Sequence, residues 1–153
     1  MSDLRELYQE IILDHNRQPR NRHAMDDATG EVEGHNPLCG DKVTVYLKVE
    51  DGVIADVSFE GQGCAISTAS ASLMTEGVKG KTVEEAMALS HRMRDMLTGE
   101  NDGALDAEAR AALGKLVVFA GVRDYPMRVK CATLSWRTLD AATRGERETV
   151  TTE

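Results

Sequence analysis

Two short segments of alternating apolar and polar residues constrain the fold of this chain more than any other feature of its sequence. Apolar side chains recur at every second position in residues 43–49, and the same spacing returns in residues 53–59. This period of two is typical of strands that bury one face. Because the turn residues Asp51 and Gly52 lie between the segments, the sequence predicts an antiparallel hairpin.

The register of this hairpin is inferred from the need to keep one face apolar. A two-residue loop would place Leu47 opposite Asp56 and so mix the core face with the solvent face. A three-residue loop over residues 50–52 would instead pair Leu47 with Ala55 and keep the apolar residues together. We therefore expect the three-residue loop, with Gly52 in the left-handed conformation that it requires.

Helical signals dominate the rest of the chain. One apolar stripe marks a first helix that ends before Pro19, and it consists of Leu4, Leu7, Tyr8, Ile11 and Ile12. Thr82 and Glu85 have the spacing of a capping box, which predicts a helix from there to about Leu97. The other expected elements are a strand near residues 29–35 and helices over residues 64–76, 106–120 and 128–143.

These elements together predict an α+β fold. We expect a small antiparallel β-sheet of about three strands, covered by helices, with a helical insertion before the last helix. No linker, repeat or low-complexity segment divides the chain, so residues 1–143 are expected to form one domain. The polar residues 144–153 are expected to be a disordered tail.

Charge and hydropathy exclude two classes of partner. The chain has 18 Lys and Arg residues against 26 Asp and Glu residues, and its net charge of −8 has the wrong sign for binding phosphates. No apolar segment approaches the roughly 18 residues of a membrane span, and no signal-peptide core follows Met1. We expect a cytoplasmic protein that binds neither nucleic acid nor membrane.

Three cysteines are the strongest candidates for chemistry. A disulfide framework is not expected, because their number is odd and the cytoplasm keeps thiols reduced. The predicted hairpin brings Cys39, Asp41 and Cys64 to one end, and Gly40 allows the backbone to bend so that its two neighbours converge. Cys131, early in the last helix, would complete three sulfurs and one oxygen, a set that suits Zn²⁺ or an iron–sulfur cluster. The alternative is that the cysteines are only small buried residues.

Other polar residues are weaker candidates. His35 is the histidine closest in sequence to a cysteine, and an exposed loop histidine is the alternative interpretation. The serines of residues 67–72 lack the motif that frames a nucleophilic serine, so we interpret them as helix-packing residues. Arg123, Arg128 and Lys130 surround the third cysteine, and these cations would offset the negative charge of three thiolates and a carboxylate.

Four motifs spread over nearly the whole chain are shared with a known family. They are Asp14-His15 with Pro19-Arg20-Asn21, then Asn36-Pro37-Leu38-Cys39-Gly40-Asp41, then Phe59-Glu60-Gly61-Gln62-Gly63-Cys64-Ala65-Ile66-Ser67, and finally Val129-Lys130-Cys131-Ala132. In combination they resemble the U-type iron–sulfur cluster assembly proteins, and most closely the SufU-like branch. Members of that branch bind zinc and relay sulfur from a cysteine desulfurase.

The sequence departs from the scaffold branch of the same family. IscU-like scaffolds carry a histidine directly before their third cysteine and a Leu-Pro-Pro-Val-Lys chaperone-recognition segment upstream. Here Lys130 takes the place of that histidine, and residues 125–130 read Tyr-Pro-Met-Arg-Val-Lys. The stretch before the third cysteine is also longer, and residues 101–114 look like the insertion of SufU-type proteins. A chaperone-handled scaffold is therefore not expected.

The resemblance implies a ligand set, a role and partners. The implied zinc ligands are Cys39, Asp41, Cys64 and Cys131, with Cys39 as the acceptor of persulfide sulfur. A SufS-like cysteine desulfurase would supply the sulfur, and a downstream cluster-assembly scaffold would receive it. Two alternatives use the same residues: a scaffold that binds a nascent [2Fe–2S] cluster, and a purely structural zinc module. Iron and labile sulfide content, together with desulfurase stimulation, distinguish these possibilities.

Overall fold

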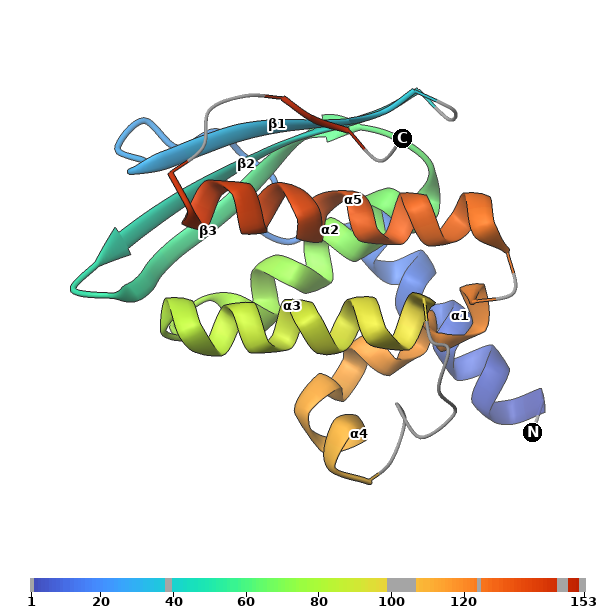
Figure 1. Cartoon of the computed structure of the whole chain (residues 1–153). Coiled ribbons are helices and arrows are strands. Elements are labelled where there is room, and N and C mark those ends of the chain that lie inside the picture. Colours follow the sequence, from blue (N-terminus) through green and yellow to red (C-terminus); the bar gives the residue numbers. More distant parts are fainter. Residues whose placement is uncertain (1, 38–39, 99–106, 124, 146–148, 152–153) are drawn as a thin grey trace.

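A four-stranded sheet lies along one side of the molecule, and the helices cover one of its faces (Figure 1). The computed structural model describes residues 2–37, 40–98, 107–123, 125–145 and 149–151. The strands are β1 (Gly30–Asn36), β2 (Asp41–Glu50), β3 (Val53–Gln62) and β4 (Val150–Thr151), in the order β3-β2-β1-β4. Strands β1 to β3 are antiparallel, as predicted, and β4 runs parallel to β1. The α+β class is confirmed, and β4 makes the sheet mixed.

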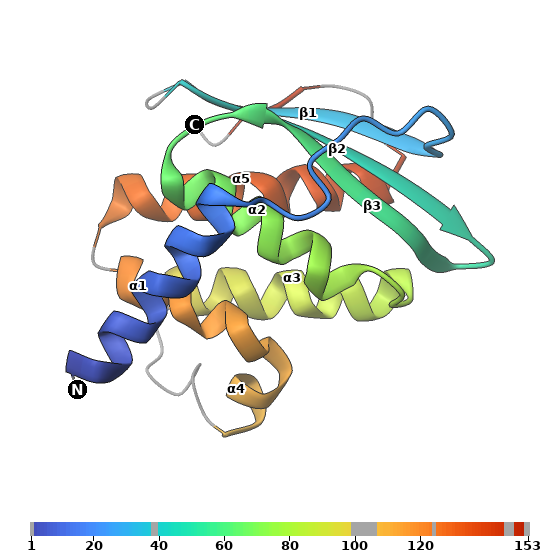
Figure 2. The same ribbon diagram turned by 180° about the vertical axis from the view of Figure 1, so that it is seen from behind.

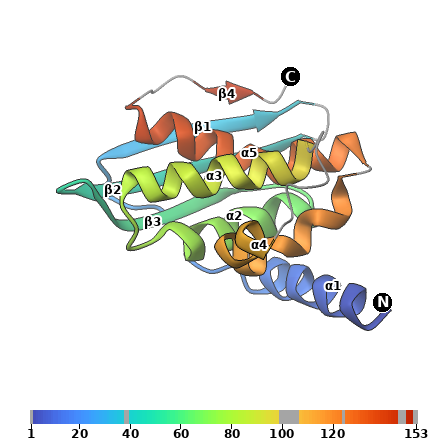
Figure 3. The same ribbon diagram turned by 60° about the horizontal axis from the view of Figure 1, so that its bottom comes forward.

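The helices form two layers beneath the sheet. They are α1 (Ser2–Arg17), α2 (Ala65–Val78), α3 (Val83–Thr98), α4 (Ala107–Leu113), the 3-10 helix η2 (Gly114–Val122) and α5 (Pro126–Thr143). Helix α5 packs on β1 and β2, α2 packs on β3, and α3 lies across both helices (Figure 3). The expected helical insertion corresponds to α4 and η2, and residue 106, where the predicted helix over residues 106–120 begins, lies outside the described residues. Within the described part, no helix combines the length and apolar composition needed to cross a membrane.

The capping box before α3 is confirmed by two reciprocal hydrogen bonds. The Glu85 backbone N–H donates to Thr82 Oγ1 at 3.1 Å, and the Thr82 backbone N–H donates to Glu85 Oε1 at 3.0 Å. These bonds satisfy donors that the first helical turn leaves without partners. The start of α3 therefore follows directly from local sequence.

The expected three-residue loop between β2 and β3 is wrong. Asp51 and Gly52 alone form the turn, with φ angles of 53° and 77°, and Glu50 pairs with Val53. Two successive residues with positive φ are the geometry of a type I′ turn, whose twist matches the twist of the strands it joins. Asp51 tolerates this conformation better than most residues that have a side chain.

A β-bulge removes the conflict that the two-residue loop would otherwise cause. Lys48 pairs with Asp56 but Val49 pairs with Ile54, so Ala55 is an extra residue in β3. The extra residue shifts the register and places Leu47 opposite Val57. As a result Ile54 is buried in the core and Ala55 is exposed, the reverse of the prediction for Ala55.

The core lies between the sheet and its helices. At two places another segment of the chain lies close to a strand of the sheet. Gly34 lets α5 lie directly on β1, because a Cβ at this position would overlap the Thr138 hydroxyl. The segment between α1 and β1 runs along β3 (Figure 2), where the Asn21 carbonyl accepts the Phe59 N–H at 3.0 Å. The largest fully buried side chains include Leu47, Ile54, Met74, Met93, Met96, Leu97, Phe119, Leu134, Trp136 and Leu139.

Candidate metal centre

Three of the four predicted ligands lie together. One ligand atom from each of Asp41, Cys64 and Cys131 lies within 4.8 Å of the others. Asp41 is the first residue of β2, Cys64 immediately precedes α2, and Cys131 lies in the second turn of α5. The fourth predicted ligand, Cys39, lies outside the described residues. His35 is in β1 and does not join this group of described residues.

The Asp41 carboxylate is buried and held by the segment that leads into α2. Its Oδ1 accepts the Cys64 backbone N–H at 2.9 Å, and the Cys64 thiol donates to its Oδ2 at 3.6 Å. The side chain is 1% exposed. Gly63 makes this contact possible, because a Cβ at that position would lie 2.8 Å from Asp41 Oδ1. The glycine before Cys64 is therefore required by the close approach of the carboxylate.

Cys64 caps the start of α2. Its Sγ accepts the Ser67 backbone N–H at 3.4 Å, which satisfies one donor of the first helical turn. Cys64 is exposed, whereas Cys131 is 3% exposed. The described centre thus offers one accessible sulfur and two buried ligand atoms.

The donor set fits a thiophilic metal ion. Two sulfurs and one carboxylate oxygen are among the atoms that zinc prefers, and a structural zinc site takes four ligands in a tetrahedron. The described ligand atoms also accept N–H hydrogen bonds, which orient them. Cys39, which lies in sequence between β1 and β2, is the expected fourth ligand.

Basic and apolar side chains are exposed at the start of α5, just before Cys131. The Arg128 guanidinium lies 4.6 Å from the centre of the Tyr125 ring, a cation–π contact. Tyr125 and Met127 are about half exposed, and Lys130 directly precedes Cys131. Positive charge therefore lies along the chain beside the third cysteine, as the sequence suggests.

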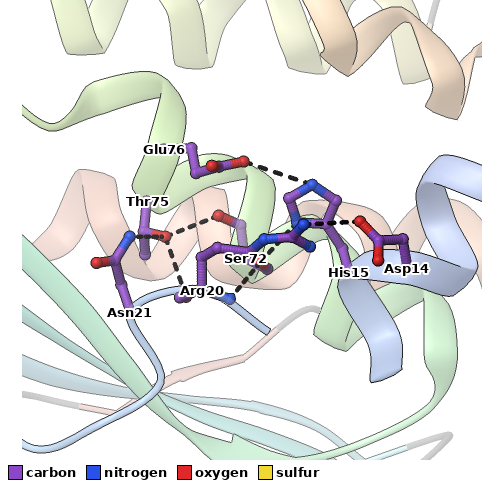
Figure 4. Close-up of polar contacts among 7 residues, drawn as sticks. All are labelled: Asp14, His15, Arg20, Asn21, Ser72, Thr75 and Glu76. Atoms are coloured by element: carbon purple, nitrogen blue, oxygen red, sulfur yellow. Dashed lines mark hydrogen bonds and ion pairs between the residues drawn. The ribbon is translucent and has the colours of Figure 1, made fainter. Parts of the chain in front are cut away.

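A second polar cluster joins α1 to α2 (Figure 4). His15 is 2% exposed, and its Nδ1 lies 2.7 Å from Ser72 Oγ. Its Nε2 lies 3.4 Å from the Glu76 carboxylate, and the Arg20 backbone N–H donates to Ser72 Oγ at 2.9 Å. Asn21 Nδ2 donates to Thr75 Oγ1 at 3.0 Å. The cluster fixes both α1 and the loop after it onto one face of α2.

The sequence indicated this cluster only indirectly. Asp14-His15 and Pro19-Arg20-Asn21 contribute to the family resemblance, yet the contact between His15 and Ser72 spans 57 residues. The interpretation of the α2 serines as packing residues agrees with their contacts, since Ser70 Oγ donates to the Ala132 carbonyl of α5 at 2.6 Å. The hydroxyl groups of Ser70 and Ser72 therefore link α2 to neighbouring helices, and neither residue belongs to the ligand group.

Mild acid is expected to destabilise the folded chain through His15. Burial, followed by the nearby Arg20 guanidinium, lowers the pKa of His15 from 6.5, although the Glu76 and Asp14 carboxylates oppose the shift. The unfolded chain therefore binds a proton at a pH where the folded chain does not. This contribution to stability is complete above about pH 6.5 and is lost as the pH falls below that value.

Urea unfolding between about pH 7.5 and about pH 5 measures this effect. The unfolding midpoint of the unmodified chain should fall over this range, and it should fall less steeply in His15→Gln. His23→Gln is the matched control, because it removes an exposed imidazole from the loop between α1 and β1 and should not reproduce the change in slope. Equal slopes for His15→Gln and the unmodified chain would contradict the prediction.

Comparison with known proteins gives matches over most of the chain. The NifU-like N-terminal domain matches residues 7–132, a span that contains all four sequence motifs. The zinc-dependent sulfurtransferase SufU of Bacillus subtilis (strain 168) is 41% identical over 140 residues, which are 91% of this chain and 90% of that protein. The iron–sulfur cluster assembly scaffold protein IscU of Thermotoga maritima is 45% identical over 136 residues, 89% of this chain and 92% of that protein. Among solved structures, FiSufU from Fervidobacterium islandicum AW-1 has a TM-score of 0.80 and 39% identity, over 87% of this chain and 93% of that chain.

Proposed function

This chain belongs to the NifU-like N-terminal domain family, and from that premise we propose that it is a zinc-dependent sulfur-transfer protein of iron–sulfur cluster assembly. The observation that carries the proposal is the convergence of Asp41, Cys64 and Cys131 within 4.8 Å. The similarity to a relative named as a zinc-dependent sulfurtransferase supports it. The proposed ligands are these three residues and Cys39.

Zinc bound by this set would keep its thiol ligands deprotonated at neutral pH. The residues of the chain supply orientation: Asp41 is held by the Cys64 N–H, and Cys64 is held by the start of α2. Cys39 is proposed as the sulfur acceptor because it lies in sequence between two strands rather than at a helix start or within a helix.

The proposed reaction is the transfer of one sulfur atom from a cysteine desulfurase. The Cys39 thiolate attacks the terminal sulfur of a persulfide carried by the desulfurase cysteine. A new sulfur–sulfur bond forms to Cys39, the bond to the desulfurase breaks, and the desulfurase cysteine leaves as a thiolate. No external oxidant or reductant is needed. The Cys39 persulfide then passes its terminal sulfur to a thiolate of a downstream assembly scaffold.

A second candidate function is a scaffold that binds a nascent [2Fe–2S] cluster through the same residues. The similarity to a relative named as a cluster assembly scaffold favours it. Lys130 is the observation against it, because the scaffold branch has a histidine at this position. We therefore place sulfur transfer first.

Metal content and desulfurase stimulation test the proposal together. Protein purified without oxygen should contain about one zinc per chain, with neither iron nor labile sulfide. Adding it to a SufS-like desulfurase with free cysteine should raise the rate of alanine formation. Iron with labile sulfide would instead support the scaffold, and zinc without stimulation would support a structural zinc module.

Replacing Asp41 by alanine is expected to weaken the centre without emptying it. The change removes the oxygen ligand and one negative charge but leaves three thiols, so zinc affinity should fall by at least about 10-fold. Stimulation of the desulfurase should also fall. Competition with a chromogenic chelator measures affinity, and alanine formation measures stimulation.

Glu33→Ala is the matched control for Asp41→Ala. It removes one carboxylate from an exposed position on the same sheet and lies outside the ligand group. Both affinity and stimulation should remain unchanged in this control. Unchanged stimulation of the desulfurase by a folded Asp41→Ala variant would show that Asp41 is not needed for sulfur transfer.

A further inference from the structure

The three described ligand residues accept N–H hydrogen bonds from different kinds of donor. The Cys64 backbone donates to Asp41 Oδ1, and the Ser67 backbone donates to Cys64 Sγ. The donor to Cys131 Sγ is a side chain, the Asn36 carboxamide, at an N···S distance of 3.8 Å. Of these three hydrogen bonds, substitution of a donor side chain can therefore remove only the one from Asn36.

Asn36 lies where the β1–β2 hairpin meets α5. It is the last residue of β1, it pairs with Asp41, and it is 1% exposed. Its backbone carbonyl accepts the Gly40 N–H at 2.9 Å, which closes the turn between the two strands. The Asn36 carbonyl and the Asn36 carboxamide N–H thus make two different hydrogen bonds; any residue can supply the carbonyl, but few can donate a side-chain N–H to sulfur.

The chemistry of the carboxamide suits this place. A buried amide is costly without hydrogen-bond partners, so a side chain that only filled space here would be better apolar. A carboxylate of the same shape would bring a further negative charge toward the thiolate of Cys131 and the carboxylate of Asp41. An amide instead presents N–H groups to a sulfur that bears negative charge when it coordinates a metal.

We propose that Asn36 is a positioning residue of the metal centre, and this proposal rests on the proposed function. Its N–H holds Cys131 Sγ toward Asp41 and Cys64 and withdraws some electron density from the sulfur. Outer partners of this kind typically contribute 10–100-fold to metal affinity. This hydrogen bond to sulfur is distinct from the backbone hydrogen bond between Gly40 and Asn36 that closes the β1–β2 turn.

Asn36→Leu tests the proposal, because leucine has the same branched arrangement of four side-chain heavy atoms and no N–H to donate. Zinc affinity, measured by competition with a chromogenic chelator, should fall by about 10–100-fold. In the cobalt-loaded protein, the sulfur-to-metal charge-transfer absorption should move to longer wavelength, since a sulfur without its hydrogen bond gives up electrons more easily.

Thr138→Val is the matched control. It also replaces a buried donor by an apolar group of equal size, on the same helix as Cys131, where Thr138 Oγ1 donates to the Leu134 carbonyl at 2.7 Å. Its affinity and cobalt spectrum should match those of the unmodified chain. Asn36→Ala, which also removes the N–H donor and adds no bulk, decides the question if Asn36→Leu does not give a native circular dichroism spectrum.

The outcomes separate this inference from the proposed function. Normal affinity and an unshifted cobalt spectrum in a folded Asn36 variant would overturn the role of Asn36 and leave the proposed function intact. A lower melting temperature without a spectral shift would also overturn it, because that result indicates a purely structural role. If the unmodified chain bound neither Zn²⁺ nor Co²⁺, the proposed function and this inference would fail together.

Discussion

Cys39→Ser should acquire no sulfur from a cysteine desulfurase, while retaining its fold and part of its zinc. Serine keeps the size of the side chain but is not a nucleophile toward a persulfide at neutral pH, so transfer should fall to background. Three proposed ligands remain, and Cys39 lies in sequence between β1 and β2. Incubation with desulfurase and free cysteine, followed by mass spectrometry of the intact protein, detects the added sulfur atom.

Cys64→Ser and Cys131→Ser are the matched comparison. These two variants should lose zinc first and sulfur transfer as a result. Cys64 caps α2 and Cys131 is buried in α5, so each is tied to a helix that positions it. Loss of either thiol should lower zinc affinity by more than about a hundredfold, which exceeds the effect of losing a group that only hydrogen-bonds to a ligand. Loss of sulfur transfer then follows from loss of the metal. If Cys39→Ser gains sulfur as well as the unmodified chain, the acceptor is another cysteine, and Cys131 beside Lys130 becomes the next candidate.

Gly34→Ala is expected to destabilise the protein by about 2–3 kcal/mol. The added methyl would overlap the Thr138 hydroxyl and approach Leu134 Cδ1 to 3.1 Å, so α5 must move away from β1. A well-packed core does not absorb such a shift without loss. Because α5 carries Cys131 and β2 carries Asp41, the same shift should weaken zinc binding. Urea unfolding and chelator competition measure the two effects.

The double variant Gly34→Ala, Thr138→Ala tests the cause of this effect. Removing the hydroxyl and methyl of Thr138 opens the space that the new methyl needs, so part of the stability should return. The two substitutions should be non-additive, as expected for residues in contact. Additive losses would show that the cost of Gly34→Ala arises from the backbone of β1 and not from the approach of α5.

Local sequence was sufficient for the elements that depend on neighbours in the chain. The Thr82 and Glu85 box specified the start of α3, and the alternation in residues 43–49 specified β2, because in both cases the signal and its cause lie within a few residues. The sequence also predicts that Asp41 lies near Cys64, although the observed register between β2 and β3 differs from the expected one.

Features that depend on distant partners were not predicted. An alternation of apolar and polar residues carries no signal for an extra residue, so it could not indicate the bulge at Ala55. The neighbouring Ile54 exchanges backbone hydrogen bonds with Gly80 and Lys81, which are distant in sequence. Strand β4 is only two residues long, too short for a periodic signal. The side-chain bond from Asn36 to Cys131 spans 95 residues, and no local pattern indicates it.

The origin of the ligands in three separate segments links the centre to the order in which the chain is made. Asp41 begins the β2–β3 hairpin and Cys64 follows it, but Cys131 belongs to the last helix. In the proposed ligand set, Cys39, Asp41 and Cys64 are therefore synthesised long before Cys131, and closing that gap is slow because the contact is distant in sequence. The complete centre can form only after α5 has covered β1 and β2. An unfinished chain thus lacks the full proposed ligand set, so we expect tight metal binding only after folding is complete.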